Sequence, residues 1–199
     1  MRSSQISIIL GVLVAPALAS AQIGQPGAHP RYEVELEPHV LAEWDNSAPC
    51  QNDGLGAGLR AVIPFLQDGP VPAINNNMGI GFGLDYAHYS ANSCSIFQPI
   101  FTGSLSASVW TIPVVLHWNF FLLPKISVFG EFGVVWQHWS WDTPYACASN
   151  PQGVCSGSTS TNQLNVAPAA GGRFMVTDKF GFLLRLGWPY VSAGAVFWM

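Results

Sequence analysis

Residues 78–86 alternate strictly between large apolar side chains and small or polar ones. Met78, Ile80, Phe82, Leu84 and Tyr86 fall on one side of an extended chain, and Gly79, Gly81, Gly83 and Asp85 fall on the other. This period of two predicts a β-strand with one wholly apolar face, because a helix would place residues three and four apart on the same side. An apolar face of this kind has to be buried in a protein core or placed against lipid.

Charge is too scarce for the surface of a soluble domain of this size. Only 9% of the 199 residues are charged and 49% are hydrophobic, with a mean hydropathy of +0.29; an ordinary soluble domain has roughly 25% charged residues. The formal net charge of −4 disfavours a nucleic-acid partner, which would require a basic surface. We therefore expect lipid, not water, around the apolar faces.

The first 21 residues have the features of a cleaved export signal. Arg2 is followed by an uncharged stretch over 6–21 that ends Ala19-Ser20-Ala21, the small-x-small pattern cut by signal peptidase. We assign 1–21 as signal peptide and 22–199 as one mature domain. The longest later apolar run, 109–123, is interrupted by Pro113 and by polar residues, so it does not predict a spanning helix. Besides a helix, a closed β-barrel is the other structure in which every backbone N–H and C=O group forms a hydrogen bond inside lipid.

Eight alternating segments follow, separated by clusters rich in Gly, Pro, Asn, Asp or Ser. They cover 32–44, 55–65, 78–89, 109–120, 126–139, 164–175, 180–188 and 190–198. This number and spacing predict an all-β fold, an eight-stranded antiparallel up-and-down transmembrane β-barrel. The connections around Cys94 and over 142–162 are long, as expected of outer loops, and those near Pro124 and Asp178 are short. Pro38, Pro113 and Pro168 interrupt the segments and predict bulges or shifted strand ends.

Outward-facing aromatic residues are expected at two heights, as in the girdles of membrane barrels. With the N-terminus on the periplasmic side, one set falls at the outer rim: Trp44, Tyr86, Trp110, Trp136 and Trp188. The other set falls at the inner rim: Tyr32, Phe65, Trp118, Phe120, Phe174, Phe180 and Phe197.

The last residues resemble the signal that the outer-membrane assembly machinery reads. In residues 192–199, Ser192, Gly194, Phe197 and Met199 occupy the polar, glycine, hydrophobic and final hydrophobic positions, although that final position is usually Phe. With its eight segments, the whole mature chain resembles small outer-membrane barrels of Gram-negative bacteria, the OmpA/OmpX-like and opacity-protein-like group. The resemblance implies an integral, monomeric protein of the outer membrane. Its expected partners are outer-membrane lipids and the outer-membrane assembly machinery.

Four cysteines in an exported chain predict disulfides. All four fall in outer connections, and among the three possible connectivities we expect Cys50 with Cys94 and Cys147 with Cys155. No Cys/His spacing typical of zinc occurs, so we expect no metal and no other cofactor.

Every charged residue within the strands falls on the inward face. The inward set comprises Glu33, Glu35, Glu37, Glu43, Asp85, Glu131, Arg60, Arg173, Arg185, His39 and His117. Because an eight-stranded barrel is just wide enough for side chains to fill, we expect Arg60 to pair with Glu37 or Asp85, and Arg173 or Arg185 with Glu131. Such pairing predicts a plugged lumen; an ion path through the polar interior, making the protein a narrow channel, is the alternative.

A lipid hydrolase is a second alternative. His138-Trp139-Ser140 resembles the His-x-Ser of lipid A deacylases, but the acid that this family places about a dozen residues later is absent, and Asp142 is the local substitute. A histidine of the aromatic girdle explains His138 equally well. We therefore expect no catalytic site, and a structural or surface-interaction role through the outer loops, with a ligand that the sequence does not identify.

Overall fold

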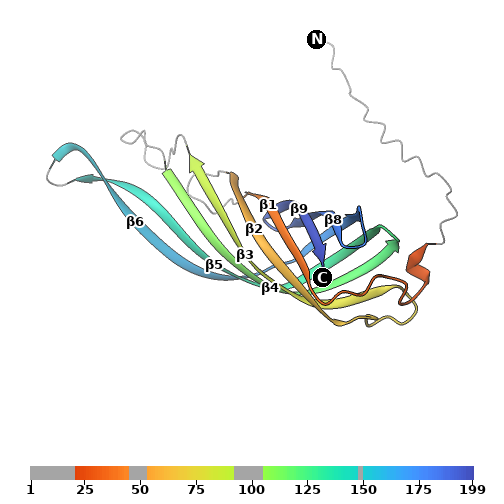
Figure 1. The fold of residues 1–199 in the computed structure, drawn as a ribbon. Helices are drawn as coiled ribbons and strands as arrows, with labels where there is room; N and C mark the ends of the chain where they lie inside the picture. The colour runs from red at the N-terminus through yellow and green to blue at the C-terminus, as the bar shows by residue number, and fades with distance from the viewer. Residues whose placement is uncertain (1–20, 45–52, 92–104, 148–149) are drawn as a thin grey trace, which may run out of the picture.

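The computed structural model describes residues 21–44, 53–91, 105–147 and 150–199 as an antiparallel sheet closed into a barrel (Figure 1). One short 3-10 helix, η1 (Gln22–Gly24), precedes the strands. The strands are β1 (Glu35–Trp44), β2 (Asp53–Leu66), β3 (Asn76–Ala91), β4 (Leu105–Leu123), β5 (Ile126–Cys147), β6 (Asn150–Val166), β7 (Ala169–Met175), β8 (Phe180–Gly187) and β9 (Tyr190–Trp198). Most of the predicted signal peptide, residues 1–20, lies outside the described residues. No described helix is long and apolar enough to span a membrane.

Successive strands pair from β1 to β6 and again from β7 to β9, and β1 pairs with β9 to close the barrel. Two strands share the place beside β5 in the barrel wall. β7 pairs with the first residues of β5, and β6 pairs with the remaining part of β5. The barrel is therefore eight-stranded, and the predicted fold class is confirmed. Pro168 explains the interruption between β6 and β7, because proline has no N–H to donate to the ladder.

Several predicted boundaries were wrong. The expected outer loop over 142–162 is largely strand, because β5 continues to Cys147 and β6 begins at Asn150. Pro38 and Pro113 cause no shift in register; each stays in the ladder, opposite Leu59 and Val135. The shifts occur at Pro64/Leu66, Phe121/Leu123 and Ala146/Cys147, close to strand ends.

The two ends of the barrel differ. We call the base the end that carries η1, the β4–β5 turn and Met199, and the rim the opposite end, beyond which the β5–β6 hairpin projects (Figure 1). β8 and β9 are joined through Trp188 and Pro189 alone, so the wall is low beside this tall hairpin. At the base, the β4–β5 and β7–β8 turns are short and the β2–β3 connection is longer, over residues 67–75. Strands that extend beyond one end of the barrel are typical of the outer end of outer-membrane barrels.

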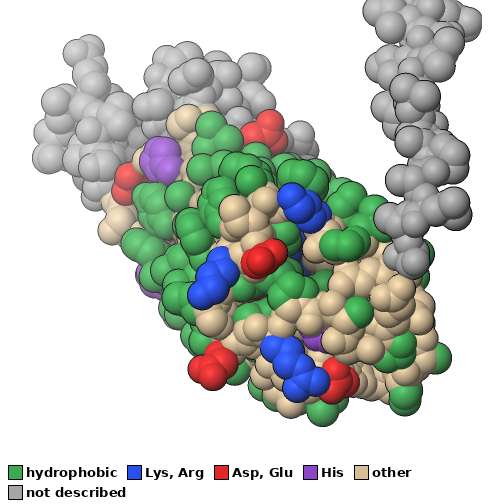
Figure 2. Space-filling model, turned by 45° about the vertical axis from the view of Figure 1, so that its right-hand side comes forward, with side chains coloured by type: hydrophobic (Ala, Val, Ile, Leu, Met, Phe, Trp, Pro, Cys, Tyr) green, Lys and Arg blue, Asp and Glu red, His purple; other side chains and the backbone are tan. Residues whose placement is uncertain are grey.

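Large apolar side chains cover the outside of the barrel. Leu55 is 71% exposed, Phe132 66% and Leu184 52%, and each lies on the outward face predicted by alternation. Figure 2 shows hydrophobic side chains over much of the visible face, together with several Lys, Arg, Asp and Glu side chains. Water would strongly oppose so much exposed apolar area on a monomer, whereas lipid accepts it.

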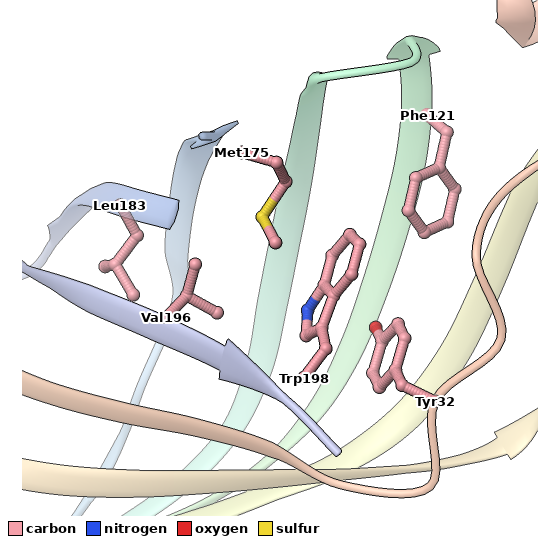
Figure 3. Packing of buried hydrophobic residues seen from close by; sticks show 6 residues of the cluster. All are labelled: Tyr32, Phe121, Met175, Leu183, Val196 and Trp198. Carbon is pink, nitrogen blue, oxygen red and sulfur yellow. The ribbon is translucent and has the colours of Figure 1, made fainter. Parts of the chain in front are cut away.

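The inside contains two apolar layers. The basal layer consists of Tyr32, Phe121, Met175, Leu183, Val196 and Trp198 (Figure 3). The rim layer consists of Leu41, Ala87, Tyr89, Val109 and Trp139. Charged and polar residues fill the space between these layers.

Two residues at the start of the first predicted segment are not where alternation placed them. Tyr32, expected in the inner girdle, is buried in the basal layer and stacks on Trp198 with ring centroids 4.8 Å apart. Glu33, expected inside the lumen, is exposed. Both precede β1, which begins at Glu35, so the alternation of a strand does not apply to them.

Candidate functional site

The lumen contains a cluster of ionic side chains supplied by seven strands. Glu35, Glu37 and His39 alternate along β1, and Arg60 on β2 stands opposite Glu37 in the ladder. The other members are Asp85 on β3, His117 on β4, Glu131 on β5, Arg173 on β7 and Arg185 on β8. Each of these nine residues is at most 5% exposed. Burial of so many ionic groups is tolerable only when they are paired and hydrogen-bonded.

Arg185 occupies the centre of this lumen network. It donates to Glu37 through Nη2, and its Nε lies 2.9 Å from Glu131 Oε2. Its guanidinium also lies over the ring of Phe129, 5.2 Å from the centroid. One guanidinium therefore joins carboxylates on opposite walls, β1 and β5.

Arg173 extends the network toward the base. Its Nε lies 2.5 Å from Glu35 Oε1, and its Nη2 is 3.4 Å from Glu37 Oε1. The same nitrogen is 2.8 Å from His117 Nε2, which accepts the hydrogen bond while Nδ1 of that ring donates to Glu131 at 2.9 Å. His117 thus links an arginine to a carboxylate.

Arg60 extends the network toward the rim. Its Nη2 donates to Asp85 at 2.8 Å, and its Nη1 donates to the Tyr190 hydroxyl at 3.1 Å and contacts Glu131 at 3.5 Å. His39 Nε2 lies 3.1 Å from the second oxygen of Asp85. Gly58 leaves the room for this carboxylate, because a Cβ there would meet Asp85 Oδ1 at 2.1 Å.

The structure brings together the six residues predicted for the lumen network: Glu37, Arg60, Asp85, Glu131, Arg173 and Arg185. Of the partners considered for Arg60, it contacts Asp85 and not Glu37, and Arg185 rather than Arg173 contacts Glu131. Sequence reasoning did not assign Phe129 and Tyr190 to the network. The odd-numbered inward positions of β5 would have indicated Phe129.

The basal layer and the segment before β1 close the lumen below the network. Tyr32 accepts a hydrogen bond from Asn77, and burial raises the pKa of its phenol well above the ordinary value. His29 stacks on Phe121 with centroids 4.3 Å apart and contacts Asn75. Residues 21–34 therefore form part of the base and do not extend away from it.

The rim layer lies above the network. Tyr89 donates to Glu43, and its ring is 5.3 Å from Trp139, which stacks in turn on Trp141. Among the described residues, no group of three His, Cys, Asp or Glu side chains is placed to hold a metal ion.

The His138–Ser140 pair lies on the outward face of β5, beside the rim. His138 Nδ1 donates to Asn162 Oδ1 at 2.8 Å, and its ring stacks on Trp136. Asp142, the acid considered for a hydrolase, instead accepts a hydrogen bond from Ser106 at 2.9 Å. The described contacts thus connect His138 to an amide and to the aromatic girdle, not to an acid.

The predicted assembly residues lie in β9 and just after it. Ser192 faces inward and is 1% exposed, whereas Phe197 and Met199 are 40% and 58% exposed. Met199 exchanges backbone hydrogen bonds with Val34, donating at 2.9 Å and accepting at 3.2 Å. Cys50 and Cys94 lie outside the described residues, and so do the side chains of Cys147 and Cys155, so the disulfides stay predictions.

Comparison with known proteins shows the class of fold. No family model and no curated protein sequence matches the chain. Among solved structures, Neisserial surface protein A is similar with a TM-score of 0.55 and 11% identity, over 84% of this chain and 97% of that one. Ail of Yersinia pestis, in complex with the heparin analogue sucrose octasulfate, is similar with a TM-score of 0.48 and 12% identity, over 82% and 95%.

The chain therefore has the fold of the small eight-stranded outer-membrane β-barrels, and the resemblance inferred from sequence is confirmed at that level.

Proposed function

We propose that the mature chain is an integral outer-membrane barrel with a closed lumen, whose role is to present its rim and projecting hairpin for contact outside the cell. The observation that carries the proposal is the lumen network between two apolar layers. Arg60, Arg173 and Arg185 each contact at least two acidic side chains, and these contacts cross the barrel interior.

Conduction would require ions or water to pass three successive obstacles. The basal layer is apolar and stacked, the network consists of side chains already paired with each other, and the rim layer is aromatic. Moving an ion past paired guanidinium groups means breaking buried ion pairs, which is costly in a low-dielectric interior. The narrow-channel alternative therefore conflicts with the packing.

The outward surface supports the membrane assignment. Exposed aromatic residues stand near the two ends of the apolar flank, with Trp110 45% and Trp188 66% exposed toward the rim and Phe65 51% and Phe174 52% toward the base. Aromatic girdles at two heights are typical of barrels that span a bilayer.

Planar-bilayer recording tests the closed lumen. Refolded protein that shows a heat-dependent gel shift is expected to give no discrete conductance steps. Steps from the folded wild type would contradict the proposal and favour a channel. The informative variant combines Arg185→Ala with Arg173→Ala and so removes two of the three guanidinium groups. If this variant folds and conducts ions, the lumen network is the barrier to conduction. If it folds and does not conduct, the apolar layers are sufficient to close the lumen.

A further inference from the structure

Among the described strands, none pairs with the second edge of the β5–β6 hairpin. In the described part of the chain, β6 pairs with β5 alone, and its other edge adjoins the low wall where β8 ends at Gly187 and β9 begins at Tyr190. Side chains from Ser158 to Val166 are exposed except for that of Thr161, which is half-buried, so neither face of this stretch is packed. An unpaired edge is a template for another strand.

The ladder shows which residues present the free edge. Ala167 N–H donates to Gly133 at 2.9 Å, and the register from Val134–Val166 to Ala146–Val154 is continuous. Because hydrogen-bonded and non-hydrogen-bonded pairs alternate in an antiparallel ladder, odd-numbered residues of β6 direct their backbone groups toward β5. Even-numbered residues, including Ser158, Ser160 and Asn162, direct theirs toward the free edge.

This edge has none of the usual protection against pairing. Exposed edge strands are commonly blocked by lysine, inward-pointing charge or a proline. From Gly153 to Val166 the strand contains no charged residue and no proline, and residues 132–172 contain no Lys or Arg at all. Ser and Thr instead dominate 156–161, and such side chains hydrogen-bond across strands.

We propose that the free β6 edge pairs antiparallel with the β6 edge of a second copy of this chain in a facing membrane. The inference rests on the proposed function, because it needs the rim to be outside the cell. The regular part of β6, Val154–Val166, has Ser160 at its midpoint. A two-fold axis there places Ser160 opposite its own copy and Ser158 opposite Asn162, and each such pair exchanges two backbone hydrogen bonds.

Orientation selects facing membranes over neighbours in one membrane. The hairpin projects beyond the rim, at the end opposite to η1 (Figure 1). Two copies in one membrane point the same way, so their β6 strands would be parallel. In a parallel pair, a residue that directs its backbone groups toward the partner strand lies opposite a residue that directs its groups away, so two identical edges must be shifted by one residue. A two-fold axis along the strands places each residue level with its own copy and does not allow this shift. In facing membranes the β6 strands of two copies run antiparallel, so the same edge of each strand can pair with the other.

Vesicle clustering tests the proposal. Wild-type protein is reconstituted into two vesicle populations of zwitterionic lipid that carry a donor or an acceptor dye, and energy transfer reports contact between them. We expect clustering above that of protein-free vesicles. Ser160→Pro removes an edge N–H without removing one used by β5 and should abolish clustering, whereas Ser160→Ala keeps the N–H and should cluster like wild type.

Charge exchange at the same position identifies the partner as a second copy. Vesicles with Ser160→Lys and vesicles with Ser160→Glu should each fail to cluster alone, because like charges would lie directly opposite. A mixture of the two populations should cluster. If the mixture stays dispersed although the wild type clusters, β6 edges do not meet at Ser160 and the proposal is wrong.

Folding and conductance keep the two proposals apart. Each variant must show the heat-dependent gel shift, and the protease accessibility of the hairpin must show that rims face outward. Folded, outward-facing wild type that does not cluster overturns the self-pairing and leaves the edge for an extended segment of another protein, while the closed barrel stands. Conductance steps would instead overturn the closed lumen.

Discussion

Replacing Arg185 is the sharpest test of the lumen network. Its guanidinium is 0% exposed and contacts Glu37 and Glu131, so Arg185→Ala leaves two buried carboxylates short of a cation. Removing one partner of a buried ion pair costs about 3–5 kcal/mol. Glu37 keeps Arg173 at 3.4 Å and Glu131 keeps His117 at 2.9 Å, so we expect a loss near the lower figure, about 3 kcal/mol in the free energy of unfolding.

The measurement is urea unfolding of protein refolded in short-chain phosphatidylcholine vesicles, followed by tryptophan fluorescence and the heat-dependent gel shift. The control variant is Lys179→Ala, which also removes one positive charge but lies in the exposed turn between β7 and β8. It should change the free energy of unfolding by less than about 0.5 kcal/mol. Adding Glu37→Gln to Arg185→Ala should recover part of the loss, because one uncompensated charge is gone. A loss below about 1 kcal/mol for Arg185→Ala would refute the reasoning and indicate a hydrated lumen.

Three further outcomes are expected. Trp198→Ala, which removes the stack on Tyr32, should cost about 3–5 kcal/mol, and more than Trp188→Ala on the lipid-facing rim, by the same unfolding assay. Gly194→Val should prevent pairing of β9 with β1, because a Cβ at this position would lie 2.3 Å from Pro38 O, and no gel-shifted barrel should form. The control Gly24→Ala should assemble normally, because a Cβ there meets no atom within 4 Å. Peptide mass mapping without reduction should yield two linked pairs, Cys50–Cys94 and Cys147–Cys155, and a Cys50–Cys147 peptide would exclude that connectivity.

Alternation predicts the fold of this chain because each strand of a small barrel has one face toward lipid and one toward the lumen. That local rule correctly placed Leu55, Phe132 and Leu184 outside and Arg60 and Arg185 inside. It failed at Tyr32 and Glu33, where the chain has not yet entered β1. It also missed the height of the hairpin, because Ser, Thr and Asn are typical of loops, and nothing local shows that β5 and β6 continue as a paired ladder.

The sequence by itself therefore determined that this chain forms an eight-stranded barrel, which face of each strand meets lipid, and that the charges lie inside, since these depend on residue type and a period of two. Only the tertiary structure decided which arginine pairs with which carboxylate, since Arg185 meets Glu37 across 148 positions of sequence. It also decided that, among the described strands, none pairs with the β6 edge beside the low β8–β9 wall. Both depend on barrel closure and strand register, which bring distant segments together and have no local signature.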